Sequence, residues 1–590
     1  MKKLLCVLLC LLLAVAVFAG CNNNTISDRP TQPQGPVNTG DPNSGVHYDE
    51  NGELYVPRHD GVTLKIGIPL SAHVIDYVDN AYTQWLEEKT GITLEFQTYS
   101  SSTADYKKQL ATDTGSGSVV LPDLLLNFTL GEELIQTYGE DGYLMDVTKY
   151  VEDEYEAAIF WDRLNEMRDD PNGDYDAFVD RIWMLMHSNS RTGDSDEQGE
   201  IYGLPRVVTS LTDTMDFMPY INTNWLRAVN KSVPTNWNEL VDVLRAFKNG
   251  DPNGNGDTTD EIPMIGAKND QLCGDIIAWL LNFWVYSNND HWFNVDDNGK
   301  VYLPHTTDAY RDGMAAISAL VSEGLLHPKS LSYENKSLNN LLVNGDYVGV
   351  LVGQPTLVFN SNLEIINRFD VLNLYGNAYY KEETLSIRNF ITTDCRNVDA
   401  AWDLLMLMYT KEAAIRQRWG EEGVNWKWSE EGVMSPMGLP ASINVMKEEW
   451  STPTSAHWNI VLTIATYDCH DLIEVDTTNA WNAAKWGVFS ESAANYKQAV
   501  KNTINKVGAE NICPWLRFNE DEDEISKDRD SLKKEINAWM SKFILGEKNA
   551  KNPSDWAEYL AAMDKAGIQK YIDAAQLCYD RMYPNGHASK

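Results

Sequence analysis

A short polar run in the middle of the chain has the spacing of a calcium-binding loop. It reads Asp251-Pro252-Asn253-Gly254-Asn255-Gly256-Asp257-Thr258-Thr259-Asp260-Glu261. Oxygen-bearing side chains recur at alternate positions, position six is a glycine, and Asp257 at position seven would bind through its backbone carbonyl. This pattern matches the front half of an EF-hand, but Ile262 stands where the EF-hand has its closing glutamate. The ion would be structural, because no water-activating base adjoins the loop. The alternative is a polar Asn-Gly turn that holds no metal.

Residue patterns that would indicate an enzyme are hard to find. The chain contains no HExxH, GxSxG, P-loop or dinucleotide-binding glycine motif, and its ten histidines lack ligand spacing. A pair of glycosidase carboxylates stays open, since nothing singles out two of the 86 acidic residues. Aromatic residues are abundant, with 19 Trp, 28 Tyr and 15 Phe. Flat aromatic faces stack on the C–H faces of sugars, although most tryptophans in a chain of this length belong to the core.

The amino terminus has the features of a secretory signal. Lys2 and Lys3 precede an apolar segment over residues 4–18, which is too short for a stable spanning helix. Small residues and then Cys21 follow, which is similar to a bacterial lipobox. The similarity implies that Cys21 becomes the lipidated first residue of the mature chain, with two or more acyl chains, such as palmitate, for durable anchoring. Ordinary secretion with cleavage near Ala19 is the alternative. Residues 21–59 are then expected to form a disordered polar tether.

Composition excludes some classes of partner and function. The formal net charge of −38 argues against nucleic acid as a partner. No segment after the signal is long and apolar enough to cross a membrane. Beyond the signal and Cys21, five cysteines remain without metal-ligand spacing: Cys273, Cys395, Cys469, Cys513 and Cys578. We expect them to be small buried hydrophobic residues, and a single disulfide stays open.

Alternating strand and helix patterns open the folded body. Strands are predicted over 62–70, 92–98 and 121–128, and helices over 80–90 and 104–112. This order predicts parallel βαβ units, whose ligands lie beyond the carboxyl ends of the strands. Further on, 217–222 is predicted to be a strand that leads into a helix carrying Trp225. Thr235 is the predicted N-cap of a helix that runs to Phe247.

Several later segments, in this order and spacing, are typical of one family. They read GEIYGLP, YINTNWL, VPTNWNELVDVLRAFK, DPNGNGDTTDEIP, DGMAAISALVSEGLLHP and RWGEEGVNW. The chain resembles extracellular solute-binding proteins of ABC importers, family 1, over most of residues 60–430. The resemblance implies an α/β, two-lobed, periplasmic-binding-protein-like (type 2) fold with a hinge and an interlobe cleft. The corresponding division is 60–216 plus 386–425 for lobe 1 and 217–385 plus 426–590 for lobe 2, with crossovers near 217–222 and 386–391. The polar excursion over 169–200 departs from the family pattern.

The resemblance also implies a function and sites. It implies a non-catalytic, monomeric binder on the outer face of the cell membrane, which delivers a neutral or weakly polar oligosaccharide to a permease with two membrane subunits and a cytoplasmic ATPase. Related proteins close a similar calcium loop early, as Asp260 and Glu261 would. The expected metal ligands are then Asp251, Asn253, Asn255, Asp257, Asp260 and Glu261. The ligand-contacting candidates are His73, Asn127, Arg206, Trp279, Gln354, Trp419 and Trp426. An anchored glycoside hydrolase and a polysaccharide-binding protein without transport are the alternatives.

Overall fold

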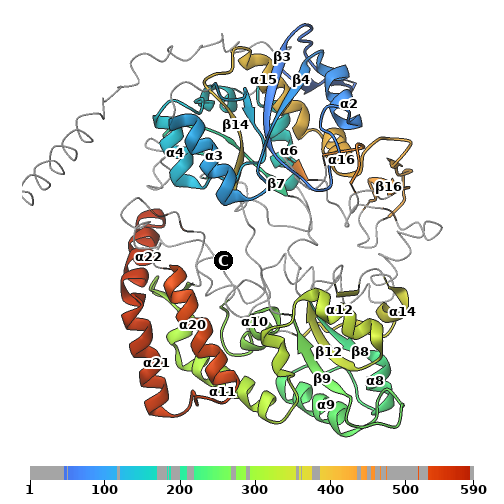
Figure 1. Cartoon of the computed structure of the whole chain (residues 1–590), viewed down its shortest axis with the longest axis vertical. Coiled ribbons are helices and arrows are strands. Elements are labelled where there is room, and N and C mark those ends of the chain that lie inside the picture. Colours follow the sequence, from blue (N-terminus) through green and yellow to red (C-terminus); the bar gives the residue numbers. More distant parts are fainter. Residues whose placement is uncertain are drawn as a thin grey trace, which may run out of the picture.

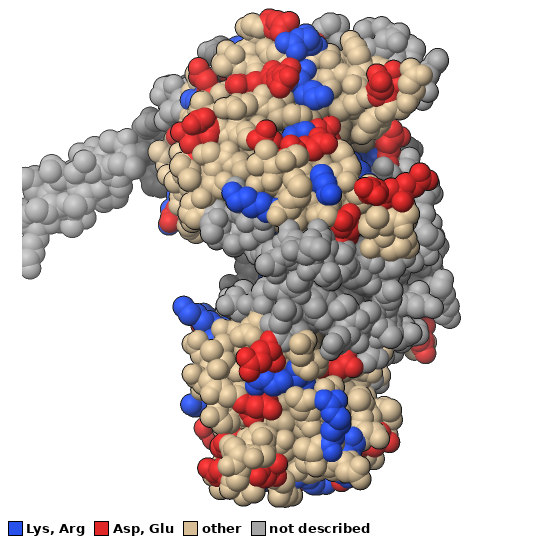
Figure 2. Space-filling model, turned by 90° about the vertical axis from the view of Figure 1, so that its right-hand side faces the viewer, with Lys and Arg blue, Asp and Glu red and all other residues tan. Residues whose placement is uncertain are grey.

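The structure is a computed structural model in which two α/β lobes stand one above the other (Figure 1). The residues that it describes are 45–49, 51–115, 120–153, 155–168, 182–183, 185–187, 199–208, 218–267, 274–287, 293–353, 358–359, 362–374, 376, 386–434, 440–447, 453–458, 465–466, 474, 516, 518 and 529–584. The two-lobed α/β fold predicted from the sequence is confirmed. Figure 2 shows acidic and basic side chains interspersed over the described surface of both lobes on the face in view.

The sheet of the first lobe has the strand order β4-β3-β5-β14-β6. These strands are β3 (Thr63–Pro69), β4 (Thr93–Tyr99), β5 (Leu124–Leu125), β6 (Leu204–Pro205) and β14 (Ile387–Ile391). Both β4 and β5 pair parallel with β3, so the predicted βαβ units are confirmed. The late strand β14 runs antiparallel between β5 and β6. The predicted strand over 121–128 is shorter than expected, because only Leu124 and Leu125 pair with neighbours.

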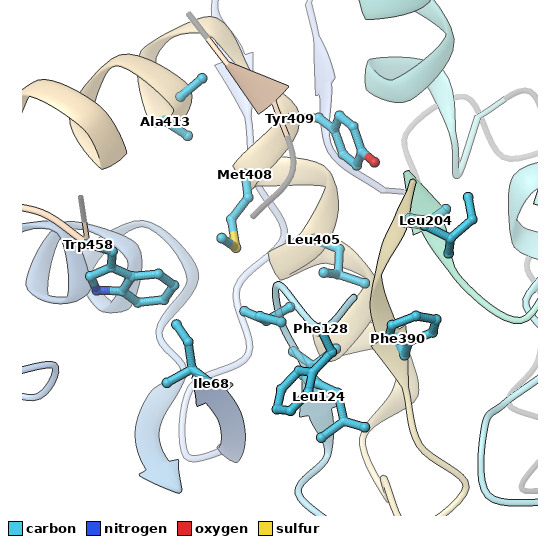
Figure 3. Close-up of a cluster of buried hydrophobic side chains, with 14 of the residues drawn as sticks. Ile68, Leu124, Phe128, Leu204, Phe390, Leu405, Met408, Tyr409, Ala413 and Trp458 are labelled. Carbon is cyan, nitrogen blue, oxygen red and sulfur yellow. The ribbon is translucent and has the colours of Figure 1, made fainter. Parts of the chain in front are cut away.

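Helices cover this sheet and supply most of its core. They are α2 (Ala81–Thr90), α3 (Thr103–Gly115), α4 (Glu132–Glu140), α5 (Thr148–Val151), α6 (Ala158–Arg168), α15 (Val398–Tyr409) and α16 (Lys411–Trp419). Gly91 ends α2 in the left-handed conformation, as a glycine stop should. The central helix is α15, of which every residue but Asp399 is buried. Figure 3 shows Leu405 and Met408 of this helix in one buried cluster with the strand residues Leu124 and Phe390.

The second lobe is built on a four-stranded sheet of order β13-β8-β12-β9. Its strands are β8 (Met218–Asn222), β9 (Ile262–Gly266), β12 (Val348–Gly353) and β13 (Phe369–Val371). Its helices are α8 (Thr223–Ala228), α9 (Trp237–Asn249), α10 (Gly274–Leu281), α11 (Asp308–Ser322), α12 (Asn335–Asn344) and α14 (Leu363–Ile366), with 3-10 turns η3 (Pro304–Thr306) and η4 (Pro328–Leu331). A hairpin of β10 (Asn294–Val295) and β11 (Val301–Tyr302) adjoins them. Three C-terminal helices, α20 (Arg529–Ile544), α21 (Pro553–Lys565) and α22 (Ile568–Met582), pack beside α11 and β11 (Figure 1).

The start of α9 corrects one capping prediction. The N-cap is Asn236 rather than Thr235, because the Asn236 side chain accepts a hydrogen bond from the backbone N–H of Glu239. The Glu239 carboxylate in turn accepts from the backbone N–H of Thr235 at 2.8 Å. Both groups therefore satisfy backbone donors at the helix start, one residue later than the sequence suggested. Trp225 and Trp237 pack edge-on against Phe247 and Trp284, respectively, so both tryptophans support the fold here.

The predicted boundary of the first lobe at residue 425 is wrong. The hairpin of β15 (Trp426–Trp428) and β16 (Ile443–Val445) follows α16, and Trp426 donates to the Gly420 carbonyl at 2.9 Å. Trp458 is fully buried between Tyr82 and Phe96 of the first lobe, and its Nε1 donates to Thr83 Oγ1 at 2.9 Å. Aromatic packing therefore holds this segment on the first lobe. Leu516 and Phe518 belong to the core of the second lobe with α20 to α22.

The predicted tether also ends earlier than residue 59. Val46 is fully buried, and β1 (His47–Tyr48) pairs with β2 (Leu54–Tyr55) in a small hairpin. Residues 45–49 and 51–59 are therefore part of the folded first lobe. Cys395 and Cys578 are buried and form no disulfide among the described residues, whereas Cys21, Cys273, Cys469, Cys513 and the excursion over 169–200 fall wholly or mostly outside the described residues. Within the described part of the chain, we find no helix with the length and apolar character needed to cross a bilayer.

Candidate ligand site and calcium loop

One edge of the first-lobe sheet gathers polar residues from distant parts of the chain. Because β14 runs antiparallel to both β5 and β6, its amino end lies beside their carboxyl ends. The carboxyl end of β3 lies at the same edge, since β3 is parallel to β5. The chain leaves this edge after β6 to form β8 in the second lobe, and it returns from the second lobe into β14. The edge therefore faces the crossovers between the lobes, where the sequence placed the ligand.

Asn127 and Arg388 form the centre of this edge. Asn127 has a left-handed backbone (φ +62°), a conformation that asparagine tolerates better than most residues. Its backbone N–H donates to Asn389 Oδ1 at 3.1 Å, and its own Oδ1 accepts from Arg388 Nη1 at 3.3 Å. The Arg388 Nε donates to Ser386 Oγ at 2.8 Å. The Asn127 side chain is thereby fixed beside a guanidinium, which is an arrangement that can bind polar groups of a ligand.

Two other predicted residues lie at the same edge. The backbone N–H of Arg206 donates to the Ser386 carbonyl at 3.0 Å, which places Arg206 next to Arg388 across the β6–β14 pair. His73 follows β3, and its carbonyl accepts from the backbone N–H of Thr454 at 3.0 Å. The buried Nδ1 of His73 has no hydrogen-bond partner among the described residues. The structure thus brings Asn127 and Arg206 together around Ser386, with His73 further along the edge.

The predicted ligand contacts of three tryptophans need correction. Trp279 is 6% exposed and donates from Nε1 to the Leu374 carbonyl at 2.8 Å, within the core of the second lobe. Trp419 and Trp426 are 1% and 0% exposed in the core of the first lobe. None of these rings presents a face to solvent, because each fills space between helices or strands. Gln354 lies outside the described residues.

Arg388 is the site residue that the sequence did not reveal. It lies within a strand, where an arginine is most simply read as a solvated surface residue. Burial lowers the pKa of the guanidinium below its ordinary value, and the Tyr106 hydroxyl partly opposes this effect. A signal did exist, since Arg388 and Asn389 interrupt the apolar residues of β14 at the point where the chain enters the first lobe.

The candidate calcium loop lies between α9 and β9 of the second lobe. Asp251 accepts hydrogen bonds from the backbone N–H groups of Asn255 and Gly256 at 3.1 and 2.9 Å. Asp260 accepts from the side-chain amides of Asn253 and Asn255 at 3.3 and 2.7 Å. Gly254 and Gly256 have φ of +71° and +84°, so glycine suits both turns. The six predicted ligands, which include Asp257 and Glu261, are therefore folded into one tight loop.

Glu261 gives this loop an unsatisfied negative charge. Both of its carboxylate oxygens are buried, and neither has a hydrogen-bond partner among the described residues. Burial raises the pKa of Glu261, and the negative charges of Asp260, Asp251 and Asp257 add to the effect. No group of three or more His, Cys, Asp or Glu side chains in the described residues has the arrangement of a metal centre. Amide and backbone oxygens supply the remaining donors here, and such a set of hard oxygens fits a calcium ion.

Comparison with known proteins gives relatives for part of the chain. No family model matches it. The chain is 25% identical over 332 residues to the fructooligosaccharide ABC transporter substrate-binding protein FusA of Streptococcus pneumoniae serotype 4, which covers 54% of this chain and 52% of FusA. It is 31% identical over 159 residues to lipoprotein LipO of Bacillus subtilis strain 168, which covers 27% of this chain and 30% of LipO. The chain thus matches about half the length, or less, of these curated relatives.

Solved structures match over nearly the whole fold. An extracellular solute-binding protein from Bifidobacterium longum subsp. infantis has a TM-score of 0.65 at 18% identity, covering 91% of this chain and 100% of its own. The fold is that of the extracellular solute-binding proteins. An EF-hand mutant of Streptococcus pneumoniae FusA, solved with fructo-nystose, has a TM-score of 0.60 at 21% identity and covers 89% and 100% of the two chains. The resemblance to solute-binding proteins is therefore confirmed by the fold and by the relatives.

Proposed function

We propose that this chain is the lipid-anchored extracellular substrate-binding component of an ABC importer and that it captures an oligosaccharide. The sequence match to FusA over 332 residues, combined with the two-lobed fold, is the observation that carries the proposal. The protein binds its sugar without chemical turnover, in keeping with a relative that is named a substrate-binding protein. The polar edge around Asn127 and Arg388 supplies one wall of the ligand site.

Binding favours closure of the two lobes. A ligand that contacts both lobes only in the closed state shifts the population toward that state. The hinge would lie at the crossovers near 217–222 and 386–391, because the chain passes between the lobes at β8 and β14. The closed, liganded form is what a permease with two membrane subunits and a cytoplasmic ATPase would recognise. Small-angle scattering should show a smaller radius of gyration with ligand, and an unchanged radius would favour a polysaccharide-binding protein without transport.

A binding screen tests the main proposal. A soluble form that comprises residues 22–590 is melted in the presence of neutral and acidic oligosaccharides. Each oligosaccharide that raises the melting temperature is then tested by calorimetry. A rise in melting temperature with micromolar affinity, and no cleavage of the sugar over a day, is the expected result. Cleavage of the bound oligosaccharide would replace the proposal with an anchored glycoside hydrolase. Failure of every carbohydrate to bind would reject it.

The loop over 251–261 binds a structural calcium ion. Support comes from its donor set, from the two unpartnered oxygens of Glu261, and from the EF-hand that a FusA mutant is named for. Asp251, Asn253, Asn255, Asp260 and Glu261 would bind by side chain, and Asp257 through its backbone carbonyl. Calcium should raise the melting temperature relative to chelator, since a ligand that binds only the folded state stabilises it. Equal melting in calcium and chelator would contradict the assignment.

Cys21 anchors the folded body to the outer face of the cell membrane. Residues 22–44 then act as the tether, because Val46 is already part of the first lobe. Tethering keeps the protein at high effective concentration near its permease. Replacement Cys21→Ala should release the protein from the membrane fraction into the medium. Continued membrane association of this variant would contradict lipidation at Cys21.

A further inference from the structure

In the part of the chain that the structure describes, Arg388 has no carboxylate partner, unlike Arg368 and Arg416. Arg368 pairs with Asp346 at 3.4 Å, and Arg416 pairs with Glu412 and Glu422 at 2.7 and 2.9 Å. Both of these arginines are partly buried, as is Arg388. Among the described residues, Arg388 contacts only neutral acceptors, the Ser386 hydroxyl and the Asn127 amide oxygen. The chain has 86 acidic residues against 48 basic ones, yet none of the described acidic side chains forms an ion pair with Arg388.

The hydrogen-bonding capacity of Arg388 is also incompletely used. A guanidinium has five N–H donors. The contacts to Ser386 and Asn127 use one N–H on Nε and one on Nη1, so that three donors have no acceptor among the described residues. The remaining donors lie along the Nη1–Nη2 edge, which is a geometry that binds a carboxylate through two parallel hydrogen bonds. The contact to Asn127 fixes the orientation of this edge.

The cost of burying an unpaired charge gives the reason to expect an anion. Removing a cation from water without a counterion is unfavourable, and no acidic side chain among the described residues pairs with Arg388 to offset it. The lowered pKa of Arg388 reflects this burial, which the Tyr106 hydroxyl opposes only in part. Arg206 adjoins Arg388 through the Ser386 carbonyl, so a second basic residue lies at the same edge. A ligand carboxylate would neutralise the charge of the Arg388 guanidinium and so stabilise the site. A neutral hydroxyl could accept a hydrogen bond from Arg388 but would not neutralise its charge.

We infer that Arg388 binds the carboxylate of an acidic sugar, so that the preferred ligand is an oligosaccharide containing hexuronate units. The inference rests on the proposed function, because it names the ligand class of the same site. It replaces the expectation of a neutral or weakly polar sugar. Asn127 holds the guanidinium in position, and Arg388 makes the contact that distinguishes acidic from neutral ligands.

Matched pairs of ligands test the inference directly. Hexuronate oligosaccharides of two to four units, from galacturonan and mannuronan, are compared by calorimetry with the same oligosaccharides after reduction of their carboxyl groups. The acidic form should bind about ten- to hundredfold more tightly, as expected for hydrogen bonds to a charged group. Equal affinity of the two forms in every pair would overturn the inference. If only neutral oligosaccharides bind, the proposed function survives and the inference fails; if no sugar binds, the proposed function itself fails.

Variants connect any preference to Arg388. Arg388→Gln should remove the difference between the acidic and reduced forms, and Arg388→Lys, which retains the charge, should keep part of it. Arg245→Gln is the control, because Arg245 is an exposed arginine of the second lobe in an ion pair with Glu323. Melting curves establish that each variant is folded. A preference for the acidic form that persists in Arg388→Gln would assign the carboxylate to another residue.

Discussion

The Nε2 atom of His59 lies 2.7 Å from the carboxylate Oδ2 of Asp403, across 344 positions of sequence. His59 lies between β2 and β3, and Asp403 lies on the central helix α15. Burial raises the pKa of Asp403, the contact with His59 opposes that effect, and the neighbouring Asp399 adds to it. The pair therefore fastens the start of the folded chain to the helix at the centre of the first lobe.

Loss of this contact should destabilise the protein in a pH-dependent way. His59→Ala leaves a buried carboxylate without its partner, which should cost about 1–3 kcal/mol at pH 7. Since the folded state binds the Asp403 proton more tightly than the unfolded state does, the contribution of Asp403 to stability falls as the pH rises above 3.8. The decrease in the free energy of unfolding caused by His59→Ala should thus be smaller at pH 4, where protonation of Asp403 removes its unpaired charge. Urea unfolding at both pH values measures this, and Arg58→Ala in an exposed neighbouring pair should have little effect. An equal loss at both values would contradict the role of the charge.

Glu261→Gln should abolish the calcium dependence of melting. The substitution removes a carboxylate whose two oxygens are buried and have no partner among the described residues. In the presence of chelator, the variant should therefore melt at the same temperature as the natural protein or higher. The calcium-induced rise seen in the natural protein should be lost. Asp296→Asn is a matched control, because Asp296 also accepts backbone N–H groups in an exposed turn of the same lobe. A calcium shift that survives in Glu261→Gln would place the ion elsewhere.

Asn127 offers a way to separate backbone strain from ligand binding. Asn127→Gly suits the left-handed backbone, so melting should change little while ligand affinity falls at least tenfold with the loss of the amide. Asn127→Ala loses the same amide and should also cost about 1 kcal/mol of stability, because alanine is strained at positive φ. Asn230, the other non-glycine residue with positive φ in the described part of the chain, is exposed and serves as the control. Unchanged affinity in Asn127→Gly would exclude the side chain from the site.

Trp458→Ala should destabilise the first lobe specifically. The ring is fully buried against Tyr77, Tyr82 and Phe96, so its removal should cost about 3–5 kcal/mol. Calorimetry should show the unfolding transition of the first lobe moving to lower temperature, while the transition of the second lobe keeps its temperature. Trp428→Ala is the control, since Trp428 is 40% exposed. A shift confined to the second lobe would contradict the placement of residues 453–458 on the first.

The sequence by itself determined the parts of this protein that depend on local periodicity and turn chemistry. The opening βαβ units, the glycine stop at Gly91 and the oxygen-rich loop from Asp251 were all predicted, because each is specified within a few residues. The predicted N-cap, Thr235, lies one residue before the observed N-cap, Asn236. The resemblance of ordered segments was sufficient to predict the two-lobed fold.

Tertiary structure decided which distant residues meet. Arg388 lies beside Asn127 only because β14, more than 250 positions later, inserts antiparallel between β5 and β6. Trp419 and Trp426 looked like ligand contacts, yet packing around α16 buries both. Local sequence carries no information on which side of a lobe a side chain will face once remote segments pack against it. The physical reason is that the burial and charge pairing of a side chain depend on the residues packed around it in the folded protein. These properties distinguish Arg388, which has no acidic partner among the described residues, from Arg368 and Arg416, which form ion pairs.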